Sequence, residues 1–527
     1  MKLKIKILSV VLALAFTSCL KNEIVYNTDD LDFRPWKIAA PIAKIHVPLY
    51  KSIGKWVNFD ELDLTDINGE KVICVRYTHS ETIEWDDEDL GITDISSPYG
   101  WGYELPGDIS SLPNSEFTHT ISAIAPIETA KADAYITEAE LTSFKFKLSI
   151  TIPDNLTGDV TITIPQLKDQ NGADFTRTYN NLQGVHNVPV EILTDYKLET
   201  PDKQLQMDCT FTVKSTGGGS TAGSIMADVS FLDIEVDYMK GYFGELTYKE
   251  NVEMDIDFFD ELDFEGTIGI KGIKMDVVAT NRSGLPINVK ADAFFINEGG
   301  LNEHLELDPP FDFYIDGATV PTEAAVSPFF TTMPDIEFVN GQYPSKLRFD
   351  VEGKANPDGN PNGDVTNFIV KSNDDHLANV DFTLTVPLYI KMSAYNRADT
   401  VAFDYNKIID NDEKLSKSIH NFTLTMIVDN SLPFAINLSA DAIDEAGNIV
   451  EEDIMNVNIN AKQKNPPIEI KLTQDLFEKF RAGEVKNIVL RSKAQTANED
   501  YVRVTENDYL DIVVSTRFEA NIPKNIF

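Results

Sequence analysis

Apolar and polar residues alternate along most of this chain with the two-residue period of a β-strand. Clear examples are residues 144–152 and 160–164, in which every second side chain is apolar. This period is typical of antiparallel strands that bury one face. A helical period is rare and is best developed at residues 473–481, where a threonine precedes an apolar face. We therefore predict an all-β fold.

A strand–turn–strand pattern recurs three times, and each copy has an asparagine at its turn. These residues are Asn155, Asn281 and Asn430, separated by 126 and 149 positions. Copies of this size exceed solenoid repeats of about 20–50 residues and fit β-sandwich domains. We predict tandem antiparallel β-sandwiches that arose by duplication and place these asparagines at equivalent positions. The alternative is that hairpins resemble one another because their turns are generic.

Further matches extend two of the copies. Residues 187–192 resemble residues 465–470, and residues 231–236 resemble residues 509–514, with residues 381–386 in the last-strand position of the middle copy. All four tryptophans precede the first copy, so we expect a small, separate β region there. The predicted segments are a signal peptide at 1–18, a lipidated tether at 19–33, this N-terminal region at 34–120, and sandwich copies at 121–245, 246–395 and 396–527.

The first 19 residues have the features of a lipoprotein signal. Three lysines precede an apolar stretch at residues 7–16, and two small residues precede Cys19. The stretch is shorter than the roughly 20 residues that span a bilayer, but it has the length of a signal peptide. We predict that Cys19 becomes the lipidated first residue of the mature protein. An ordinary secretory signal with an incidental cysteine is the alternative.

The charge of the chain bears on its partners. It has 45 basic and 85 acidic residues and a formal net charge of −40, which argues against nucleic-acid binding. Hydrophobic residues make up 42% of the chain, enough to fill real cores.

Besides Cys19, the sequence contains two cysteines, Cys74 and Cys209, both in strand-like segments. We expect buried free thiols rather than a long-range disulfide.

One short segment is the best candidate for recognition. Tyr99, Trp101 and Tyr103 alternate with two glycines in residues 98–103. Flat aromatic rings on an exposed loop could stack on sugars or dock against a protein. We predict this role for the three residues. The alternative is that the tryptophans fill a core.

A second segment resembles half of a calcium loop. Asp358, Asn360, Asn362 and Asp364 place oxygen ligands at alternate positions around a glycine. The twelfth position is Ile369, where such a loop has a bidentate glutamate. A Ca²⁺ site is therefore one hypothesis, and a plain Pro/Gly/Asn loop is the other.

Motifs of catalysis are absent from the sequence. It contains no G-x-S-x-G, H-E-x-x-H, phosphate loop or C-x-x-C, and its seven histidines are scattered singly. We therefore expect that the protein is not an enzyme. A pair of catalytic carboxylates for glycoside hydrolysis could still be brought together by the fold, because such a pair has no recognisable sequence motif.

Three segments resemble known families. The residues Phe16-Thr-Ser-Cys19 and the segment 36–49 are similar to those of Bacteroidota outer-membrane or surface lipoproteins. The hairpin at 281–289 resembles the β-sandwich of late-embryogenesis-abundant and water-stress proteins, although the first and third copies depart from this motif. These resemblances imply a sandwich fold and a location at the outer membrane, on its periplasmic side or at the cell surface. They bring no active site.

The sequence thus favours a lipid-anchored binding or scaffold module of the cell envelope. The expected contacts are the membrane, through the N-terminal lipid, and a carbohydrate or an envelope protein. A lipid-binding or lipid-transferring β protein is the first alternative, and a carbohydrate-active hydrolase is the second.

Replacement of the predicted lipidation site tests the anchor. The variant Cys19→Ala should appear in the soluble fraction or remain as the uncleaved precursor, because acyl chains contribute about 0.8 kcal/mol of membrane affinity per buried CH₂ group. Membrane fractionation and the mass of the mature N-terminus measure this. Full membrane retention of the cleaved variant would contradict the prediction.

Overall fold

A computed structural model of the chain describes residues 36–53, 62–83, 95–105, 116–127, 129, 131–216, 223–256, 265–297, 299–339, 342–370, 378–402 and 419–520. The predicted signal peptide, Cys19 and the whole of the predicted tether at 19–33 lie outside these ranges. The described residues form antiparallel β-sheets with few helices, which confirms the predicted all-β sandwich fold. No helix in these ranges is long and apolar enough to cross a bilayer.

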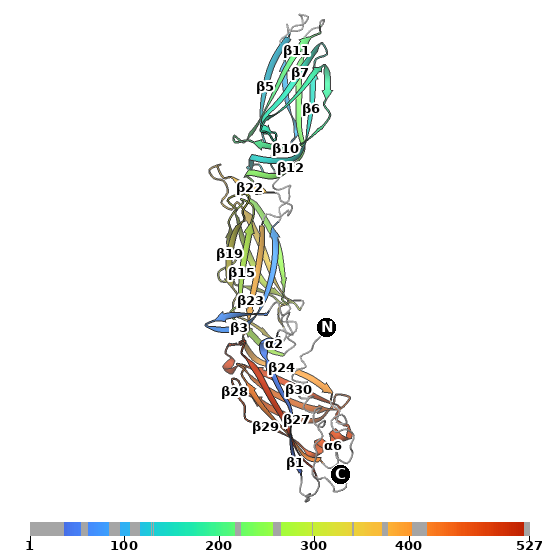
Figure 1. Ribbon diagram of the computed structural model, residues 1–527, viewed down its shortest axis with the longest axis vertical. Coiled ribbons are helices and arrows are strands. Elements are labelled where there is room, and N and C mark those ends of the chain that lie inside the picture. Colours follow the sequence, from blue (N-terminus) through green and yellow to red (C-terminus); the bar gives the residue numbers. More distant parts are fainter. Residues whose placement is uncertain are drawn as a thin grey trace.

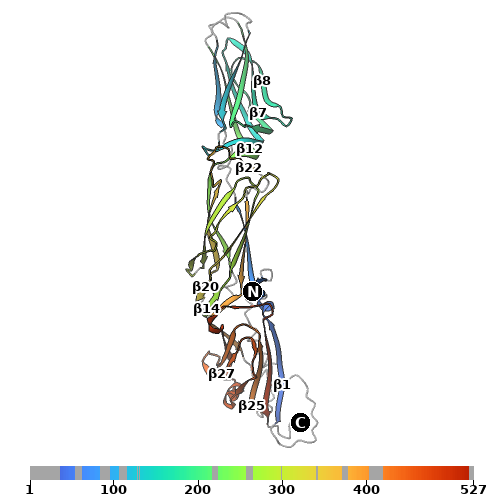
Figure 2. The same ribbon diagram turned by 90° about the vertical axis from the view of Figure 1, so that its left-hand side faces the viewer.

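The sheets build three sandwiches that stand end to end in one elongated molecule (Figures 1 and 2). We name them distal, middle and proximal by their distance from the two ends of the described chain. Burial alternates along their strands, as in residues 204–215, where every second side chain from Leu205 to Val213 is buried. One face of each strand thus packs into a core, as the sequence period predicts.

The distal sandwich is formed by the segment from residue 95 to residue 242. The strand β10 (Glu191–Glu199) pairs with strands of both layers and joins them into one folded sheet. The other strands of the first layer are β4 (Ile95–Glu104), β12 (Ser224–Tyr242), β6 (Tyr135–Ile152) and β9 (Gly184–Asn187). Those of the second layer are β5 (Glu116–Pro126), β11 (Gln204–Ser215), β7 (Leu156–Lys168) and β8 (Asp174–Leu182).

The middle sandwich has two separate sheets. Its first layer contains β2 (Leu62–Ile67), β3 (Glu70–Ile83), β23 (Ala378–Pro387), β15 (Lys274–Asn281) and β19 (Ala325–Thr332). Its second layer contains β13 (Leu246–Asp255), β21 (Lys346–Ala355), β16 (Ile287–Ile296), β17 (Asn302–Leu305) and β18 (Asp312–Ile315).

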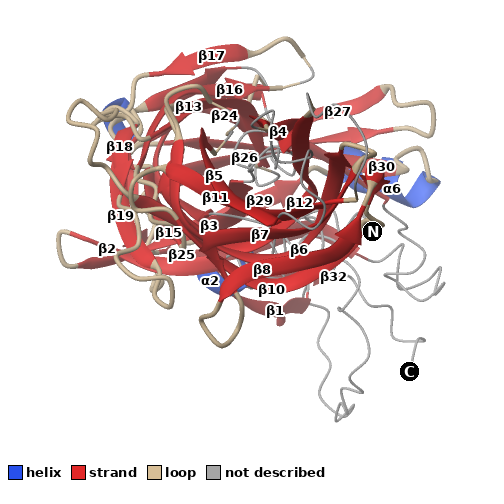
Figure 3. Ribbon diagram, turned by 90° about the horizontal axis from the view of Figure 1, so that it is seen from above, coloured by secondary structure: helices blue, strands red, loops and turns tan. Residues whose placement is uncertain are grey.

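The proximal sandwich contains the two ends of the described chain. Its first layer is formed by β1 (Trp36–Pro48), β32 (Tyr509–Ala520), β25 (Ile419–Asn430), β28 (Gln463–Lys464) and β29 (Ile468–Leu472). Its second layer is formed by β24 (Tyr389–Ala402), β30 (Asn487–Gln495), β26 (Ala435–Ile443), β27 (Ile449–Ile459) and β31 (Val502–Arg503). The helices among the described residues are α2 (Leu49–Ile53), the 3₁₀-helix η4 (Ala497–Glu499), and α6 (Gln474–Ala482), which lies outside the strand layers (Figure 3).

The three sandwiches share one topology. In each, the first strand of a repeat pairs with the last strand of that repeat: β6 with β12, β15 with β23, and β25 with β32. The strand after the asparagine turn lies in the other layer and pairs with a later strand: β7 with β11, β16 with β21, and β26 with β30. The predicted equivalence of the three hairpins is therefore confirmed.

The N-terminal strands do not form a region of their own. Instead, β1, β3 and β4 each pair with the last strand of a different sandwich, β32, β23 and β12. The expectation of a separate domain at 34–120 is therefore wrong. Each of these strands has backbone groups that need a hydrogen-bonding partner and one face that needs burial. The last strand of a repeat provides both. We call residues 36–104 the ascending segment, because it passes from the proximal to the distal sandwich.

Hydrogen-bonded strands also cross the joints between sandwiches. The strand β22 (Asn367–Val370) pairs with β12 and extends the distal sheet from the middle segment of the chain (Figure 1). At the other joint, β14 (Glu265–Ile270) pairs with β24, and β20 (Ile336–Val339) pairs with β14. Backbone pairing at both joints restrains the angle between neighbouring sandwiches.

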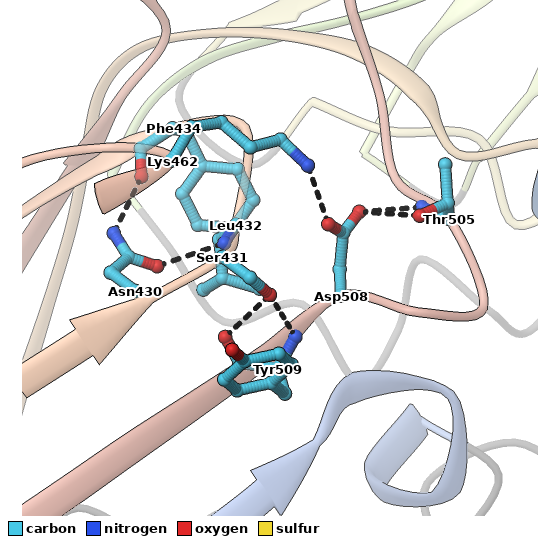
Figure 4. Close-up of polar contacts among 8 residues, drawn as sticks. All are labelled: Asn430, Ser431, Leu432, Phe434, Lys462, Thr505, Asp508 and Tyr509. Atoms are coloured by element: carbon cyan, nitrogen blue, oxygen red, sulfur yellow. Dashed lines mark hydrogen bonds and ion pairs between the residues drawn. The ribbon is translucent and has the colours of Figure 1, made fainter. Parts of the chain in front are cut away.

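The repeat asparagine of the proximal sandwich holds its turn together (Figure 4). The Asn430 Oδ1 atom accepts a hydrogen bond from the Leu432 N–H at 3.0 Å. Its Nδ2 atom donates to the carbonyl oxygens of Phe434 at 3.2 Å and Asn460 at 3.0 Å. The side chain is fully buried, so it satisfies three backbone groups that water does not reach.

The middle sandwich repeats this arrangement. The Asn281 Oδ1 atom accepts from the Ser283 N–H at 2.9 Å, and its Nδ2 atom donates to the carbonyls of Leu285 and Asp316 at 2.7 and 3.1 Å. The distal copy departs from it, because the buried Nδ2 atom of Asn155 has no hydrogen-bond acceptor among the described residues. The three asparagines identified in the sequence thus lie at equivalent turns. The side-chain hydrogen bonds to the backbone are the same at Asn281 and Asn430.

The variant Asn430→Ala should lower the free energy of unfolding by about 2–4 kcal/mol, because it leaves three buried backbone groups without their partner. Asn155→Ala is the matched control and should cost less than about 1 kcal/mol, because its amide nitrogen has no acceptor in the described part of the chain. Urea unfolding measures both, and hydrogen–deuterium exchange should place the change in β25 and β26. Equal losses for the two variants would contradict this account of the turn.

Candidate functional site

The expected aromatic loop at residues 98–103 is part of the strand β4. Trp101 is only 3% exposed and lies opposite Ala227, another core residue. Its predicted role as an exposed ring is therefore wrong, because the strand alternation turns Trp101 inward. Gly102 faces outward. The side chain of Tyr99 lies outside the described residues.

Tyr103 belongs to a group of rings at the open edge between β4 and β5. Its ring centroid lies 4.3 Å from that of His119, 5.4 Å from that of Phe211 and 5.9 Å from that of Phe117. Phe211 is buried, whereas Tyr103, Phe117 and His119 are partly accessible. We call these four residues the distal aromatic cluster. Sequence inspection found only Tyr103, since the others come from β5 and β11.

A neighbouring row of residues crosses the outer face of the first layer. Val185, Thr151, Met226 and Gly102 are successive partners on β9, β6, β12 and β4. Val185 is 69% exposed and Met226 is 44% exposed. A Cβ atom on Gly102 would meet nothing within 4 Å, so no contact within the chain requires glycine there. The glycine leaves the side of Met226 uncovered.

Both features lie near the end of the molecule that is farthest from the chain ends. Tyr135, at the start of β6, bonds to the middle sandwich, whereas Thr151 is near the other end of the same strand. In Figure 1 this end of β6 is at the top of the distal sandwich. The distal aromatic cluster and the outer row are thus the candidate functional site.

The proposed calcium loop makes contacts with the distal sandwich instead. The Oδ1 atom of Asn360 accepts from the Val365 N–H at 3.0 Å, and its Nδ2 atom donates to the Tyr135 hydroxyl at 3.3 Å. Lys203 donates to the Gly363 carbonyl at 2.8 Å, and its ammonium lies 3.6 Å from the Tyr135 ring centroid.

These contacts make the loop part of a joint. The oxygen that Asn360 would offer to a cation already holds the turn. The other three predicted ligands, Asp358, Asn362 and Asp364, are exposed. The described part of the chain contains no group of three or more His, Cys, Asp or Glu residues arranged for a metal ion.

Among the gaps between sheets in the described residues, two are small and lie inside the distal and middle sandwiches. One, inside the distal sandwich, is lined entirely by apolar side chains such as Phe144 and Phe231. The other, in the middle sandwich, has Glu81 and Glu250 among its lining residues. Each has room for only a few water molecules, far less than an acyl chain fills.

The two described cysteines are free and buried, as expected from the sequence. Burial raises the pKa of Cys209 to about 12. Burial, together with the nearby Asp63 carboxylate, raises the pKa of Cys74 to about 11. Both groups are thus thiols at neutral pH and poor nucleophiles. They lie in different sandwiches, on β11 and β3.

Comparisons with known proteins give only remote likenesses. No family profile and no curated protein matches the chain. One similar solved structure is a candidate secreted protein from Parabacteroides distasonis, 11% identical, which covers 51% of this chain and 82% of its own, with a TM-score of 0.29. Another is the tandem CBM22 domain pair of Xyn10C from Paenibacillus barcinonensis, 9% identical, which covers 54% and 86%, with a TM-score of 0.14. Likenesses this weak assign no shared function.

Thiol labelling tests the burial of the cysteines. A raised pKa keeps each thiol protonated, so at pH 8 only about one Cys74 side chain in a thousand is a thiolate, and fewer for Cys209. In a chain that begins after Cys19, a disulfide reagent should label neither residue while the protein is folded, and both in denaturant. Rapid labelling of folded protein would contradict the burial, and absence of labelling after unfolding would show a disulfide.

Proposed function

We propose that the protein is a lipid-anchored stalk that holds its distal sandwich away from the membrane as a binding module. One observation carries this proposal: three sandwiches stand end to end, and both ends of the described chain lie at the end opposite the candidate site. Trp36 pairs with Ala520 at that end. A lipid on Cys19 would therefore attach next to the proximal sandwich.

The dimensions of the strands support this role. The strand β6 has 18 residues, which at about 3.3 Å per residue span roughly 55–60 Å. Three stacked sandwiches therefore reach on the order of 100 Å. The paired strands at both joints restrain bending, so the distal site would stay remote from the anchor.

Recognition is assigned to the distal end because of the chemistry that it exposes. Partly accessible rings at the distal aromatic cluster can stack on a sugar or on an apolar protein side chain. The outer row adds exposed apolar surface at Val185 and Met226. A carbohydrate or an envelope protein is the proposed partner, and the role requires no catalysis. The two small gaps between sheets are too small for an acyl chain, so they give no support to lipid transfer.

Distances from a membrane test the proposed display. The lipidated protein is placed in vesicles that carry a headgroup quencher, with one fluorophore at Asp154→Cys in the distal turn or at Lys471→Cys in the proximal β29. Both positions are exposed, and the native thiols are buried. We expect strong quenching of the proximal label and almost none of the distal label. Similar quenching at both positions would show that the molecule lies flat, which would overturn the proposal.

A further inference from the structure

The middle sandwich has one outer face of unusual composition, on its first layer. Strand register places the side chains of β19, β15 and β23 in adjacent rows on this face. We call this surface the middle outer face, and its defining residues are Val326, Pro328, Phe330, Val278, Asp276 and Asp381.

Four of these residues form an exposed apolar group. Val326, Pro328 and Phe330 are alternate residues of β19 and all point away from the core. Ser327, between the first two, and Thr331, which follows Phe330, are buried. Val278 lies directly opposite Pro328 on β15. Val326 is 61% exposed, Phe330 45% and Val278 39%. A contiguous patch of exposed apolar side chains commonly marks an interaction site.

Two carboxylates lie beside the apolar group. Asp276 is opposite Phe330, and Asp381 is opposite Val278. Asp381 accepts hydrogen bonds from Ser80 at 2.5 Å and from the Asn379 amide at 2.9 Å, and neither aspartate has an ion-pair partner among the described residues. The nearest basic side chain along β15 is Lys274, at the end of the face toward the proximal sandwich.

The opposite face of the same sandwich provides a comparison within the chain. There, on β13, β21 and β16, lysines pair with carboxylates across strands: Lys249 with Glu352 and Lys346 with Glu253, each at 2.6 Å. Lys249 also lowers the pKa of Glu352 through its hydrogen bond. Charges on that face are thus neutralised within the molecule, whereas those on the middle outer face are not.

Pro328 determines how a partner can approach. A proline in an edge strand has no N–H to donate, so it interrupts the addition of another strand along β19. A partner must therefore pack on the face rather than extend the sheet.

We propose that the middle outer face docks a second protein whose contact surface has an apolar centre flanked by lysine or arginine. The apolar group supplies the buried centre, and Asp276 and Asp381 supply charge complementarity at its edge. A second copy of this chain is disfavoured, since each copy carries a formal net charge of −40. This inference is independent of the distal site.

Site-specific cross-linking of the intact, lipidated protein in the cells that make it tests this docking. Phe330 is replaced by benzoylphenylalanine, and after irradiation the cross-linked peptide is identified by mass spectrometry. The same residue placed at Lys249 on the opposite face is the matched control. We expect a cross-link at position 330 only, to a protein segment in which Lys or Arg flanks apolar residues. In the Asp276→Asn, Asp381→Asn background its yield should fall roughly fivefold.

Other outcomes would overturn the inference. They are a yield no higher than at position 249, a cross-link to another copy of this chain, a cross-link to lipid or glycan, and a yield unchanged by the two carboxamide substitutions. Thermal melting of each variant should match that of the unsubstituted protein, because these exposed positions carry no core packing. A lowered melting temperature would instead show that the face has a structural role.

Discussion

The whole arrangement depends on antiparallel pairing between the ascending segment and the last strand of each repeat. The strand β1 pairs with β32, β3 with β23, and β4 with β12. His46 and Asp511, which contact each other at 2.5 Å, are 465 positions apart in the chain. A single segment thus supplies an edge strand to three sandwiches. The ascending segment reaches the proximal sandwich first, then the middle and then the distal one. The three repeats that follow in the sequence build the sandwiches in the opposite order, from distal to proximal.

The sequence predicts the sandwiches well because their strands are amphipathic and their turns are local. Two-residue alternation identifies β6 and β7, and the repeated asparagine turn locates the crossing between layers. The partner of β1 could not be predicted in this way. Nothing in the pattern of residues 36–48 distinguishes an edge strand of a remote repeat from a strand of a separate domain, since both need only one buried face.

The candidate site, too, could be predicted only in part from the sequence. Tyr103 was within reach of sequence reasoning, because aromatic residues alternating with glycine are unusual in a strand. Phe117, His119 and Phe211 come from other strands, and only the packing of β4 against β5 brings the four rings together. The prediction that Trp101 is exposed is wrong because it treats the segment as a loop, whereas the segment is the strand β4. As a strand it alternates, and the described outward position next to the buried Trp101 is Gly102.

The nested path of the chain also sets an order for folding. All strands of the distal sandwich except β22 lie within residues 95–242, so a chain that emerges N-terminus first can complete this sandwich before any other. The middle sandwich needs β23, and the proximal sandwich must wait for β32, near the end of the described chain. Until then β1 keeps an unpaired edge, a state that invites association with other chains. The distal sandwich can therefore be completed first and the proximal sandwich last, and the proximal sandwich is the one exposed to mispairing for the longest time.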